Sequence, residues 1–419
     1  MFFTPLTLYN QCMDKTILHC DMNGFFASVE LLDLPELRDQ PMAVCGNPKN
    51  RHGIIVAKNE IAKKAGVKTA ETVWQARKKC PGLKLVPPHH EKYSFYCKLI
   101  NDIYYRYTDL VEPFSIDESW LDVTASEKLL GPGSEIADHI RNTVKQELNL
   151  TLSVGVSFNK IFAKMGSEYK KPDATTLISR DNYKEILWPL PVEELFFVGG
   201  VMAAKFHKLR IQTIGDLAAY DRMVIVSQFG KHGAMVHDYA NGLDNEPVAL
   251  ATERKKIKSV GNGITFKRDL VTDQDILTAV LALSDTVSSR LRQYHMKASG
   301  VKVEIKDPSF QTIHRQKQLD MPTNLAVEIT KAALDLTSNA RGQKQAIRLL
   351  TVTGINLCDE DDDQQINLFQ SLDDSLIGAE RLERTLDKIR NKYGVGAINY
   401  GQVLQNDIGI DLEEIRQEE

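Results

Sequence analysis

Three carboxylates in this chain have the type and the local setting of metal ligands. Asp21 lies where the apolar run ILHC gives way to residues with helical spacing, and Asp117 and Glu118 stand side by side in EPFSIDESWLD. A buried carboxylate is unfavourable unless a positive charge compensates it, and neighbouring carboxylates repel one another. Divalent cations relieve that repulsion, and oxygen ligands that leave room for water and phosphate suit Mg²⁺. Two such ions, roughly 4 Å apart, hold the attacking and leaving oxygens of an in-line phosphoryl transfer.

The same residues also fit a purely structural interpretation. Asp117 and Glu118 stand where a turn is expected, and acidic residues are common in turns. Asp21 precedes a helix start and would then serve as its cap. The residues alone leave both interpretations open, so the elements around them decide whether the three carboxylates meet.

Those elements alternate between strand and helix patterns. The expected elements are a strand at 16–22, a helix at 24–34 capped by Asn23, two strands around a tight turn at 117–118, an amphipathic helix at 134–148, a strand at 150–158 and a helix at 159–169. This order predicts a split βαβ sheet with helices on one face, in which the first strand lies beside the hairpin. The strand ends would then bring the three carboxylates together.

The bulk properties are those of a multidomain globular protein. A length of 419 residues is too great for one core, and 42% hydrophobic with 26% charged residues is ordinary. Six cysteines without paired spacing favour a reducing cytoplasm over a zinc site or a disulfide framework. No apolar run approaches the roughly 20 residues that span a bilayer, so we expect no membrane association. Residues 1–12 lack the basic start of a signal peptide and are expected to be an extension outside the fold.

Charge is distributed unevenly along the chain. The formal net charge is −4, yet residues 251–350 contain 17 Lys plus Arg against 10 Asp plus Glu, a net of +7. The segment CDEDDD at 358–363 is then sharply acidic. A basic region in an acidic chain indicates a polyanionic partner, although an unevenly charged solvated face is equally compatible with the charges alone.

Three stretches of the chain resemble segments of a known family. HCDMNGFFASVE and SIDESWLDVT are similar to the two metal-binding motifs of the Y-family DNA polymerases, the translesion enzymes, and LSVGVSFNKIFAKMGSEYKKPD resembles the segment that follows them. The similarity covers about residues 14 to 375, in a bacterial branch that ends in a clamp motif. It implies a template-directed, low-fidelity DNA polymerase that adds dNTPs to a primer 3′-hydroxyl with two Mg²⁺ ions, acting as a monomer on primer–template DNA.

The resemblance also implies an architecture. The fold would be multidomain α+β, a right-hand polymerase with a ferredoxin-like (split βαβ) palm. Its parts would be an N-terminal extension at 1–12, a palm at 13–171 with small fingers inserted at about 35–90, a helical thumb with a helix–hairpin–helix at 172–250, an α+β little finger that binds DNA at 251–358, and an acidic linker, clamp motif and final helix (379–393) at 359–419.

Roles at the metal site follow from the resemblance position by position. Asp21 and Asp117 would bridge both metals, Glu118 would hold the metal at the primer 3′-hydroxyl, and the backbone carbonyl of Met22 would bind the nucleotide-side metal. Many relatives carry a second Asp where this chain has Asn23. That position is not among the three carboxylates, so the change need not remove a ligand.

Roles around the nucleotide follow in the same way. Phe26 would be the steric gate beneath the sugar, with Phe25 beside it under the incoming nucleotide, and Lys63 and Lys171 would contact the triphosphate. Relatives commonly have Tyr and Arg as phosphate contacts on the fingers helix, where this chain has Glu60 and Lys63. A carboxylate would repel phosphate, so no such role is expected for Glu60.

Two further motifs concern DNA and a partner protein. In FFVGGVMAAKF, backbone N–H groups around Gly199 and Gly200 would bind a DNA phosphate, with Phe196-Phe197 in place of the usual Pro-Gly.

QINLF at 365–369 resembles the pentapeptide that binds the bacterial sliding clamp. In that motif Gln365 would bond at the pocket rim, and the apolar residues Ile366, Leu368 and Phe369 would line the contact.

Two other functions remain to be weighed against a polymerase. A two-metal nuclease would use similar carboxylates but has no need of a sugar gate. A clamp-bound DNA scaffold without catalysis would not need intact Asp21, Asp117 and Glu118.

Overall fold

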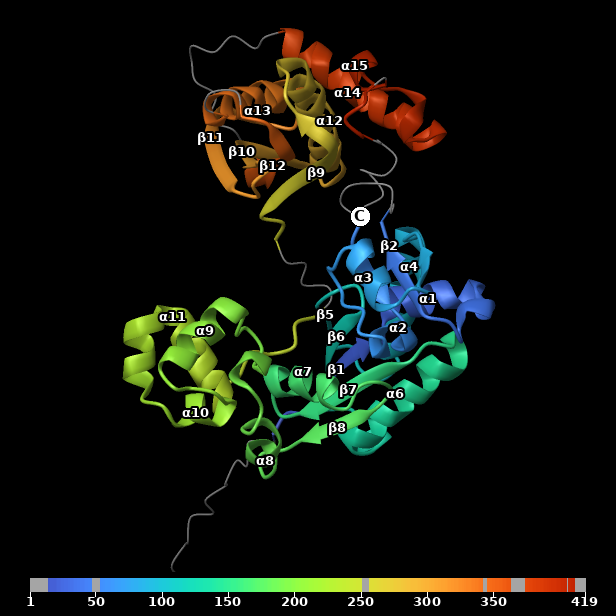
Figure 1. Cartoon of the computed structure of the whole chain (residues 1–419), viewed down its shortest axis with the longest axis vertical. Coiled ribbons are helices and arrows are strands. Elements are labelled where there is room, and N and C mark those ends of the chain that lie inside the picture. The colour runs from blue at the N-terminus through green and yellow to red at the C-terminus, as the bar shows by residue number, and fades with distance from the viewer. Residues whose placement is uncertain are drawn as a thin grey trace, which may run out of the picture. The chain divides into compact units, whose positions relative to one another are not determined.

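The computed structural model describes residues 14–46, 53–250, 256–341, 345–362, 374–404 and 406–410, with side chains of the last helix from 378 onward. The expected extension at 1–12 and the QINLF segment lie outside these ranges. The described residues form two compact units, one before and one after the break at 251–255 (Figure 1). Within the described ranges, no helix combines the length and apolarity required to cross a membrane.

Unit 1 is built on a five-stranded sheet in the order β5-β6-β1-β7-β8. The strands are β1 (Ile17–Met22), β5 (Val111–Pro113), β6 (Glu118–Asp122), β7 (Leu152–Ser157) and β8 (Thr175–Ile178). β1 pairs antiparallel with β6 and with β7, and β7 pairs parallel with β8. The predicted position of the hairpin beside the first strand is confirmed, because Asp21 lies directly opposite Glu118.

Helices cover both faces of this sheet, so the expectation of helices on one face is wrong. The helices α1 (Phe25–Asp33), α4 (His90–Tyr104) and α6 (Gly133–Leu148) share a core with Leu18 and Cys20 of β1. Helix α7 (Lys160–Tyr169) packs on the opposite face, against Gly155 of β7. A Cβ atom at Gly155 would lie 1.8 Å from the carbonyl oxygen of Ala163 in α7. The missing side chain therefore lets this helix approach the sheet backbone closely.

A second, smaller sheet lies between α1 and α4 in sequence, with strand order β3-β2-β4. It consists of β2 (Met42–Cys45), β3 (Ile55–Lys58) and β4 (Lys84–Val86), with η1 (Pro35–Leu37), α2 (Glu60–Lys64) and α3 (Val73–Lys79). Asn59 caps α2 by accepting from the Ala62 N–H at 3.0 Å, and Thr72 with Gln75 forms a capping box on α3. Its small core is separate from that of the main sheet.

The last part of unit 1 is mostly helical. The range 172–250, which was expected to be a separate helical part, also contains β8 (Thr175–Ile178), which pairs with β7 at the edge of the main sheet. It contains α8 (Tyr183–Leu187), η2 (Val192–Glu194), α9 (Gly200–Lys208), α10 (Ile214–Ala219) and α11 (Arg222–Ala240), with α5 (Glu127–Leu130) earlier in the chain. These helices enclose a core of their own around Phe206 and Ile214. Buried Lys160 ties this region to the main sheet, since its Nζ lies 2.8 Å from Glu112 and 3.3 Å from Glu246.

Unit 2 is a four-stranded sheet in the order β11-β10-β12-β9. Its elements are β9 (Ser259–Leu270), α12 (Asp273–Gln293), β10 (Met296–Lys306), β11 (Thr312–Thr323), α13 (Ala326–Ala340), β12 (Ile347–Asp359), α14 (Asp374–Tyr393), η3 (Val395–Ala397) and α15 (Gly401–Leu404). Figure 1 shows α12 and α13 on one face of the sheet. The sequence left the position of the final helix open; in the structure α14 packs on α12, where Asp387 accepts from Ser289 at 2.9 Å.

Candidate active site

The site forms where β1 and β6 end side by side at the centre of the large sheet. Side chains alternate between the faces of a strand, so Asp21 and its cross-strand partner Glu118 project from the same face as His19. That is the face that α7 covers. Oxygen atoms of Asp21, Glu118 and Glu168 lie within 4.8 Å of one another, which makes these three carboxylates able to hold one metal ion.

Helix α7 supplies both the third carboxylate and the compensating cations. Lys160, Lys164 and Glu168 recur every four residues and therefore lie along one stripe of the helix, with Lys171 just beyond its end. Lys164 bonds to the carboxylate of Glu118, and Lys171 lies 2.8 Å from Asp21 and 2.6 Å from Glu168. The close approach at Gly155 places this stripe over the strand ends.

Asp21 is only 3% exposed, and burial raises its pKa to about 8 although the Lys171 ammonium opposes that shift. Burial also raises the pKa of Asp117, against the hydrogen bond that the Ser115 hydroxyl donates to it at 2.7 Å. The charge on these two groups is thus incompletely compensated by the protein itself. An oxygen-donor cluster that is short of positive charge fits a bound divalent cation.

Glu118 behaves differently from its neighbours. Burial would raise its pKa, but hydrogen bonding and the adjacent Lys164 charge lower it to about 2. Burial lowers the pKa of His19 to about 4, so this ring is neutral. The Ser167 hydroxyl donates to the Lys164 carbonyl, and Nδ1 of His19 lies 2.8 Å from the Ser167 oxygen. Nε2 of His19 lies 3.4 Å from Glu118, and Lys164 is the charged group that compensates this carboxylate.

The segment between β1 and α1 differs from the expectation at one residue. Asn23 was expected to cap the helix, but the N-cap is Gly24, which adopts a left-handed backbone with φ 55°. The Asn23 side chain instead accepts from Ser153 at 3.0 Å, and its amide lies 3.3 Å from Thr151. Asn23 therefore ties the end of β1 to β7. The N–H of Met22 donates to the Asp117 carbonyl at 3.1 Å, which links the strand end to the hairpin turn.

The two adjacent phenylalanines have different surroundings. Phe25 is buried in the core beneath the main sheet. Phe26 is half-buried and stacks face to face on Tyr93 of α4, with ring centroids 3.9 Å apart and an interplanar angle of 9°. Of the pair, Phe26 alone is partly accessible to solvent, whereas Phe25 is buried and supports the helix from inside.

The two lysines predicted to bind triphosphate lie in separate places. Lys171 is at the carboxylate cluster, where Asp21 and Glu168 hold it and raise its pKa against the effect of burial. Lys63 is exposed on α2 of the small sheet and pairs with Glu60 at 3.5 Å. The structure thus brings Lys171 to the site, and no described contact joins Lys63 to the carboxylates.

Gly199 and Gly200 open helix α9. Gly199 is the N-cap, offers no side chain to the first-turn N–H groups, and has open space around its Cβ position. The preceding Phe197 is a non-glycine residue with φ 72°. An uncapped helix start with unobstructed N–H groups suits a phosphate.

Glu168 and Lys164 are the site residues that the sequence interpretation missed. A signal for them was present in NKIFAKMGSEYKK, since charged residues at i, i+4 and i+8 mark one stripe of a helix whose other positions are small or apolar. Recognising it required knowing that this helix packs against the sheet.

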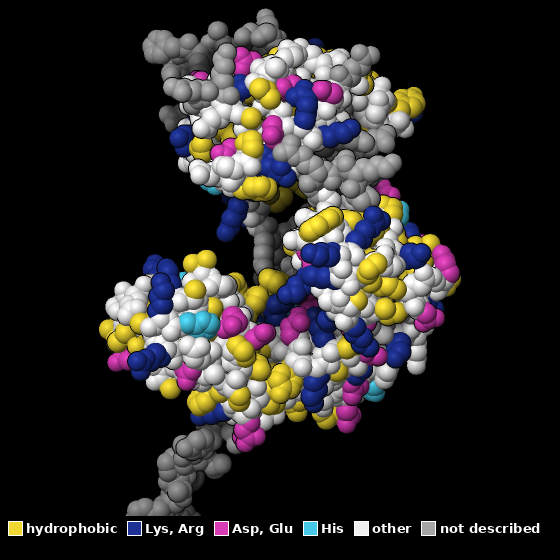
Figure 2. All heavy atoms as spheres, viewed as in Figure 1, with side chains coloured by type: hydrophobic (Ala, Val, Ile, Leu, Met, Phe, Trp, Pro, Cys, Tyr) yellow, Lys and Arg dark blue, Asp and Glu magenta, His cyan; other side chains and the backbone are white. Residues whose placement is uncertain are grey.

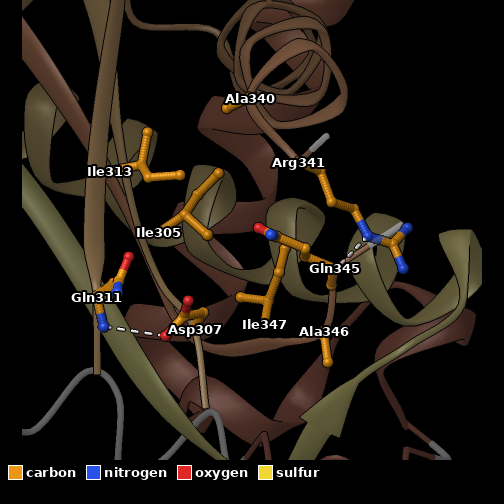
Figure 3. Close-up of a pocket in the computed structure, with 9 residues that line it drawn as sticks. All are labelled: Ile305, Asp307, Gln311, Ile313, Ala340, Arg341, Gln345, Ala346 and Ile347. Carbon is orange, nitrogen blue, oxygen red and sulfur yellow. Dashed lines mark hydrogen bonds between the residues drawn. The ribbon is translucent and has the colours of Figure 1, made fainter. Parts of the chain in front are cut away.

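A pocket in unit 2 is a poorer candidate site (Figure 3). Asp307 in it already accepts from the Gln311 N–H at 2.9 Å, and Arg341 donates to the Gln345 carbonyl at 2.8 Å and to Asp273 at 2.9 Å. Its charged groups are therefore engaged within the fold.

Comparisons with known proteins agree with this geometry. Residues 20–168 match the model of the impB/mucB/samB family, and residues 257–368 match the model of that family's C-terminal domain. The DNA polymerase IV of Acetivibrio thermocellus is 44% identical over 94% of this chain and 98% of its own length. The DNA polymerase IV 1 of Bacillus subtilis is 36% identical, with 94% of each chain covered.

A solved structure shows the same fold. A Y-family DNA polymerase chimera superimposes with a TM-score of 0.74 over 82% of this chain and 99% of the chimera, at 24% sequence identity. The chain belongs to the impB/mucB/samB family, the Y-family translesion DNA polymerases. It is a metal-dependent, DNA-directed DNA polymerase whose relatives include enzymes named DNA polymerase IV. The predicted right-hand α+β fold is confirmed.

Proposed function

We propose that this polymerase adds dNTPs to a primer 3′-hydroxyl with two Mg²⁺ ions held by Asp21, Asp117 and Glu118. The observation that carries the proposal is the register of β1 and β6, which sets Asp21 opposite Glu118 on the face covered by α7. When bound, the two ions supply charge compensation for the attacking and leaving oxygens of phosphoryl transfer. The Met22 carbonyl at the end of β1 lies at the same edge and is a further oxygen donor for the nucleotide side.

The chain's own residues bind and orient the substrates. Lys171 lies 2.8 Å from Asp21, and a triphosphate offers it an alternative anionic partner. Lys63 on α2 would meet the outer phosphates, with a single charge rather than the fork of an arginine. Lys164 stays with Glu118 and holds that carboxylate ionised at pH 7.

Phe26 is proposed as the gate that excludes ribonucleotides. Its stack on Tyr93 fixes one ring face and leaves the other for a deoxyribose, which has only hydrogen at C2′. A ribose would press its 2′-hydroxyl against the ring and leave that group without a partner, at a cost of roughly 1–3 kcal/mol. Phe26→Ala should raise ribonucleotide insertion at least about tenfold relative to deoxynucleotide insertion.

Single-nucleotide insertion with dNTP and rNTP, with and without Mg²⁺, tests both proposals. Phe25→Ala is the matched control, because it removes a buried ring next door and should cost about 3–5 kcal/mol of stability without changing sugar preference. An unchanged sugar preference in Phe26→Ala, together with a large fall in melting temperature, would show that Phe26 is a packing residue and not the gate. Failure of the wild type to insert any dNTP with Mg²⁺ would refute the two-metal proposal.

The sliding clamp is the proposed protein partner, through Gln365, Ile366, Leu368 and Phe369. Elements β12 and α14, on either side of this segment in sequence, both belong to unit 2 and are packed into it. Deleting 365–369 should abolish stimulation of primer extension by the clamp and leave extension without the clamp unchanged, because tethering raises only local concentration. Equal stimulation of the deletion variant would contradict the assignment; Leu372→Ala, just outside the motif, is the control.

DNA binding by unit 2 is proposed for the sheet face that α12 and α13 leave open. Strand alternation and cross-strand register place Lys302, Gln316 and Thr353 together on that face. Opposite Thr353, Gly261 adds no side chain. This gives a flat polar surface on which Lys302 and Lys306 can meet phosphates without reading sequence. We propose that the protein acts as a monomer in the cytoplasm. The five described cysteines are all free, which is the state that a reducing compartment maintains.

A further inference from the structure

Three aromatic rings line the junction of the main sheet and the helical part of unit 1. Phe114 precedes the Asp117-Glu118 turn, and Phe196 and Phe197 precede α9. Ring centroids lie 5.9 Å apart for Phe114 and Phe196 and 4.1 Å apart for Phe196 and Phe197. Phe114 is 44% exposed and Phe197 is 48% exposed. Figure 2 shows hydrophobic and basic side chains next to each other in this junction. We call Phe114, Phe196 and Phe197 the aromatic platform.

The aromatic platform is continuous with the metal site. The N–H of Phe114 donates to the carbonyl of Glu118 at 2.9 Å across the hairpin. The Lys164 ammonium, which bonds to the Glu118 carboxylate, lies 5.3 Å from the ring centroids of both Phe114 and Phe196. One cation therefore joins the platform to the carboxylate proposed to serve the primer 3′-hydroxyl.

The other end of the platform leads to the uncapped start of helix α9. Phe197 is separated from the N-cap Gly199 by one residue, and the first turn of α9 is uncapped. A nucleic acid strand alternates anionic phosphates with largely apolar sugars. An uncapped helix N-terminus, exposed rings and a carboxylate-bound lysine match that alternation in order.

Phe197 also adopts an unfavourable backbone. Its φ of 72° lies in the left-handed region, where a Cβ atom is disfavoured and glycine is the usual occupant. Stability alone would favour glycine at this position. A bulky exposed ring held in such a conformation is a feature typically associated with function.

We propose that the aromatic platform binds the 3′-terminal nucleotides of the primer strand, with their deoxyriboses on the rings and a phosphate at the start of α9. The platform rests on the proposed polymerase function and adds to it a surface that holds the primer end beside Glu118. Aromatic contacts of this kind are tolerant of sequence because every nucleotide offers an apolar face.

Phe197→Gly is the decisive variant, because it removes the ring and at the same time relieves the backbone. Its melting temperature should equal or exceed that of the wild type. Its dissociation constant for a recessed primer–template should rise about tenfold, which corresponds to about 1.4 kcal/mol. The measurement is fluorescence anisotropy with the full chain in EDTA, so that binding is read without catalysis.

Two variants serve as controls. Phe197→Tyr keeps an aromatic ring and should bind primer–template within about twofold of the wild type. Phe95→Ala removes a ring that is 56% exposed on α4, which covers the sheet face opposite Asp21, and should also bind like the wild type. A loss in Phe197→Tyr or Phe95→Ala as large as that in Phe197→Gly would overturn the platform.

A single-stranded template of the same length distinguishes the occupant. The platform predicts that Phe197→Gly binds this strand as the wild type does; an equal loss on both ligands would assign the rings to the template and overturn the inference. Unchanged primer–template binding with a lower melting temperature would make Phe197 a packing residue of the junction. Wild-type primer extension is measured in parallel: its absence refutes the polymerase proposal, whereas normal extension with unaffected Phe197→Gly binding refutes the platform alone.

Discussion

Two buried groups of charges, one in each unit, differ in how completely the protein matches them. In unit 2, Arg292 is 4% exposed at its side chain and bonds to Glu383 and to Asp387, and Arg390 lies 3.0 Å from Asp285. The carboxylate of Glu383 also accepts from the Ala326 N–H at 2.8 Å. Each of these carboxylates faces a guanidinium, and together they fasten α14 to α12.

The group in unit 1 lacks that match. Asp21, Asp117, Glu118 and Glu168 share only Lys164 and Lys171 among the described cations in contact with them. Burial raises the pKa of both aspartates, as it also does for Glu383 in unit 2, so the difference lies in the number of cations and not in the direction of these pKa shifts. The difference separates charges that serve the fold from charges that await a ligand. A structural ion cluster satisfies itself, whereas a metal site keeps an excess of negative charge that only the bound cation removes.

The largest expected effect comes from neutralising the unmatched group. Asp21→Asn should reduce primer extension on the order of 10³-fold, because a carboxylate proposed as a metal ligand loses its charge. The same variant should leave the melting temperature of the metal-free protein unchanged or higher, since burial already disfavours the charged form. Asp138→Asn, at an exposed carboxylate paired with Arg141, is the control and should alter neither quantity. A clear loss of stability in Asp21→Asn would show that the two groups do not differ as described.

The matched group should respond in the opposite sense. Arg292→Met should lower the free energy of unfolding by about 3–5 kcal/mol, because Glu383 stays buried without its partner. Chemical denaturation followed by circular dichroism measures this, with Arg384→Met as the control at a more exposed arginine that should cost no more than about 1 kcal/mol. Primer extension well below the melting temperature should be nearly unchanged. Equal stability losses in the two arginine variants would remove the distinction between a buried cluster and surface pairs.

The sequence predicted best those residues whose chemical type and whose place at the end of a strand indicate the same role. Asp21, Asp117 and Glu118 were candidates from their types and from one hairpin, and the family resemblance favoured the metal-ligand interpretation. The register of β1 with β6 places Asp21 opposite Glu118, as that hairpin predicted. Glu168 and Lys164 were not predicted, because they reach the site only if α7 crosses the sheet face that was expected to carry no helix. That crossing is decided by Gly155, whose missing side chain matters only when a helix lies over it.

Other departures have equally local causes. Asn23 has the type of a helix cap, but a glycine follows it and can adopt the left-handed conformation, so Asn23 is left to bond across to β7. The position of α14 was undecidable from its own apolar stripe, because the decisive contacts join Glu383 and Asp387 to an arginine some ninety residues earlier. Long-range ion pairs carry no periodic signal that a sequence window can detect.

The smallest predicted effect concerns pH and tests the unmatched group without catalysis. Asp21 has a pKa of about 8 in the metal-free fold against an ordinary value of 3.8, so the folded protein binds more protons than the unfolded chain between these values. Stability of the metal-free protein should therefore fall as pH rises from about 4 to about 8.

A divalent cation requires the ionised carboxylate and must displace that proton below pH 8. The apparent affinity for Mn²⁺, read by electron paramagnetic resonance, should rise by up to about tenfold per pH unit between pH 6 and pH 8 and then level off. Lys171 competes for the same carboxylate at 2.8 Å and reduces the slope without reversing its sign. Asp21→Asn should flatten this dependence, while Asp138→Asn should retain it. A flat profile in the wild type would mean that Lys171 already keeps Asp21 ionised. The unmatched group of unit 1 would then resemble the matched group of unit 2.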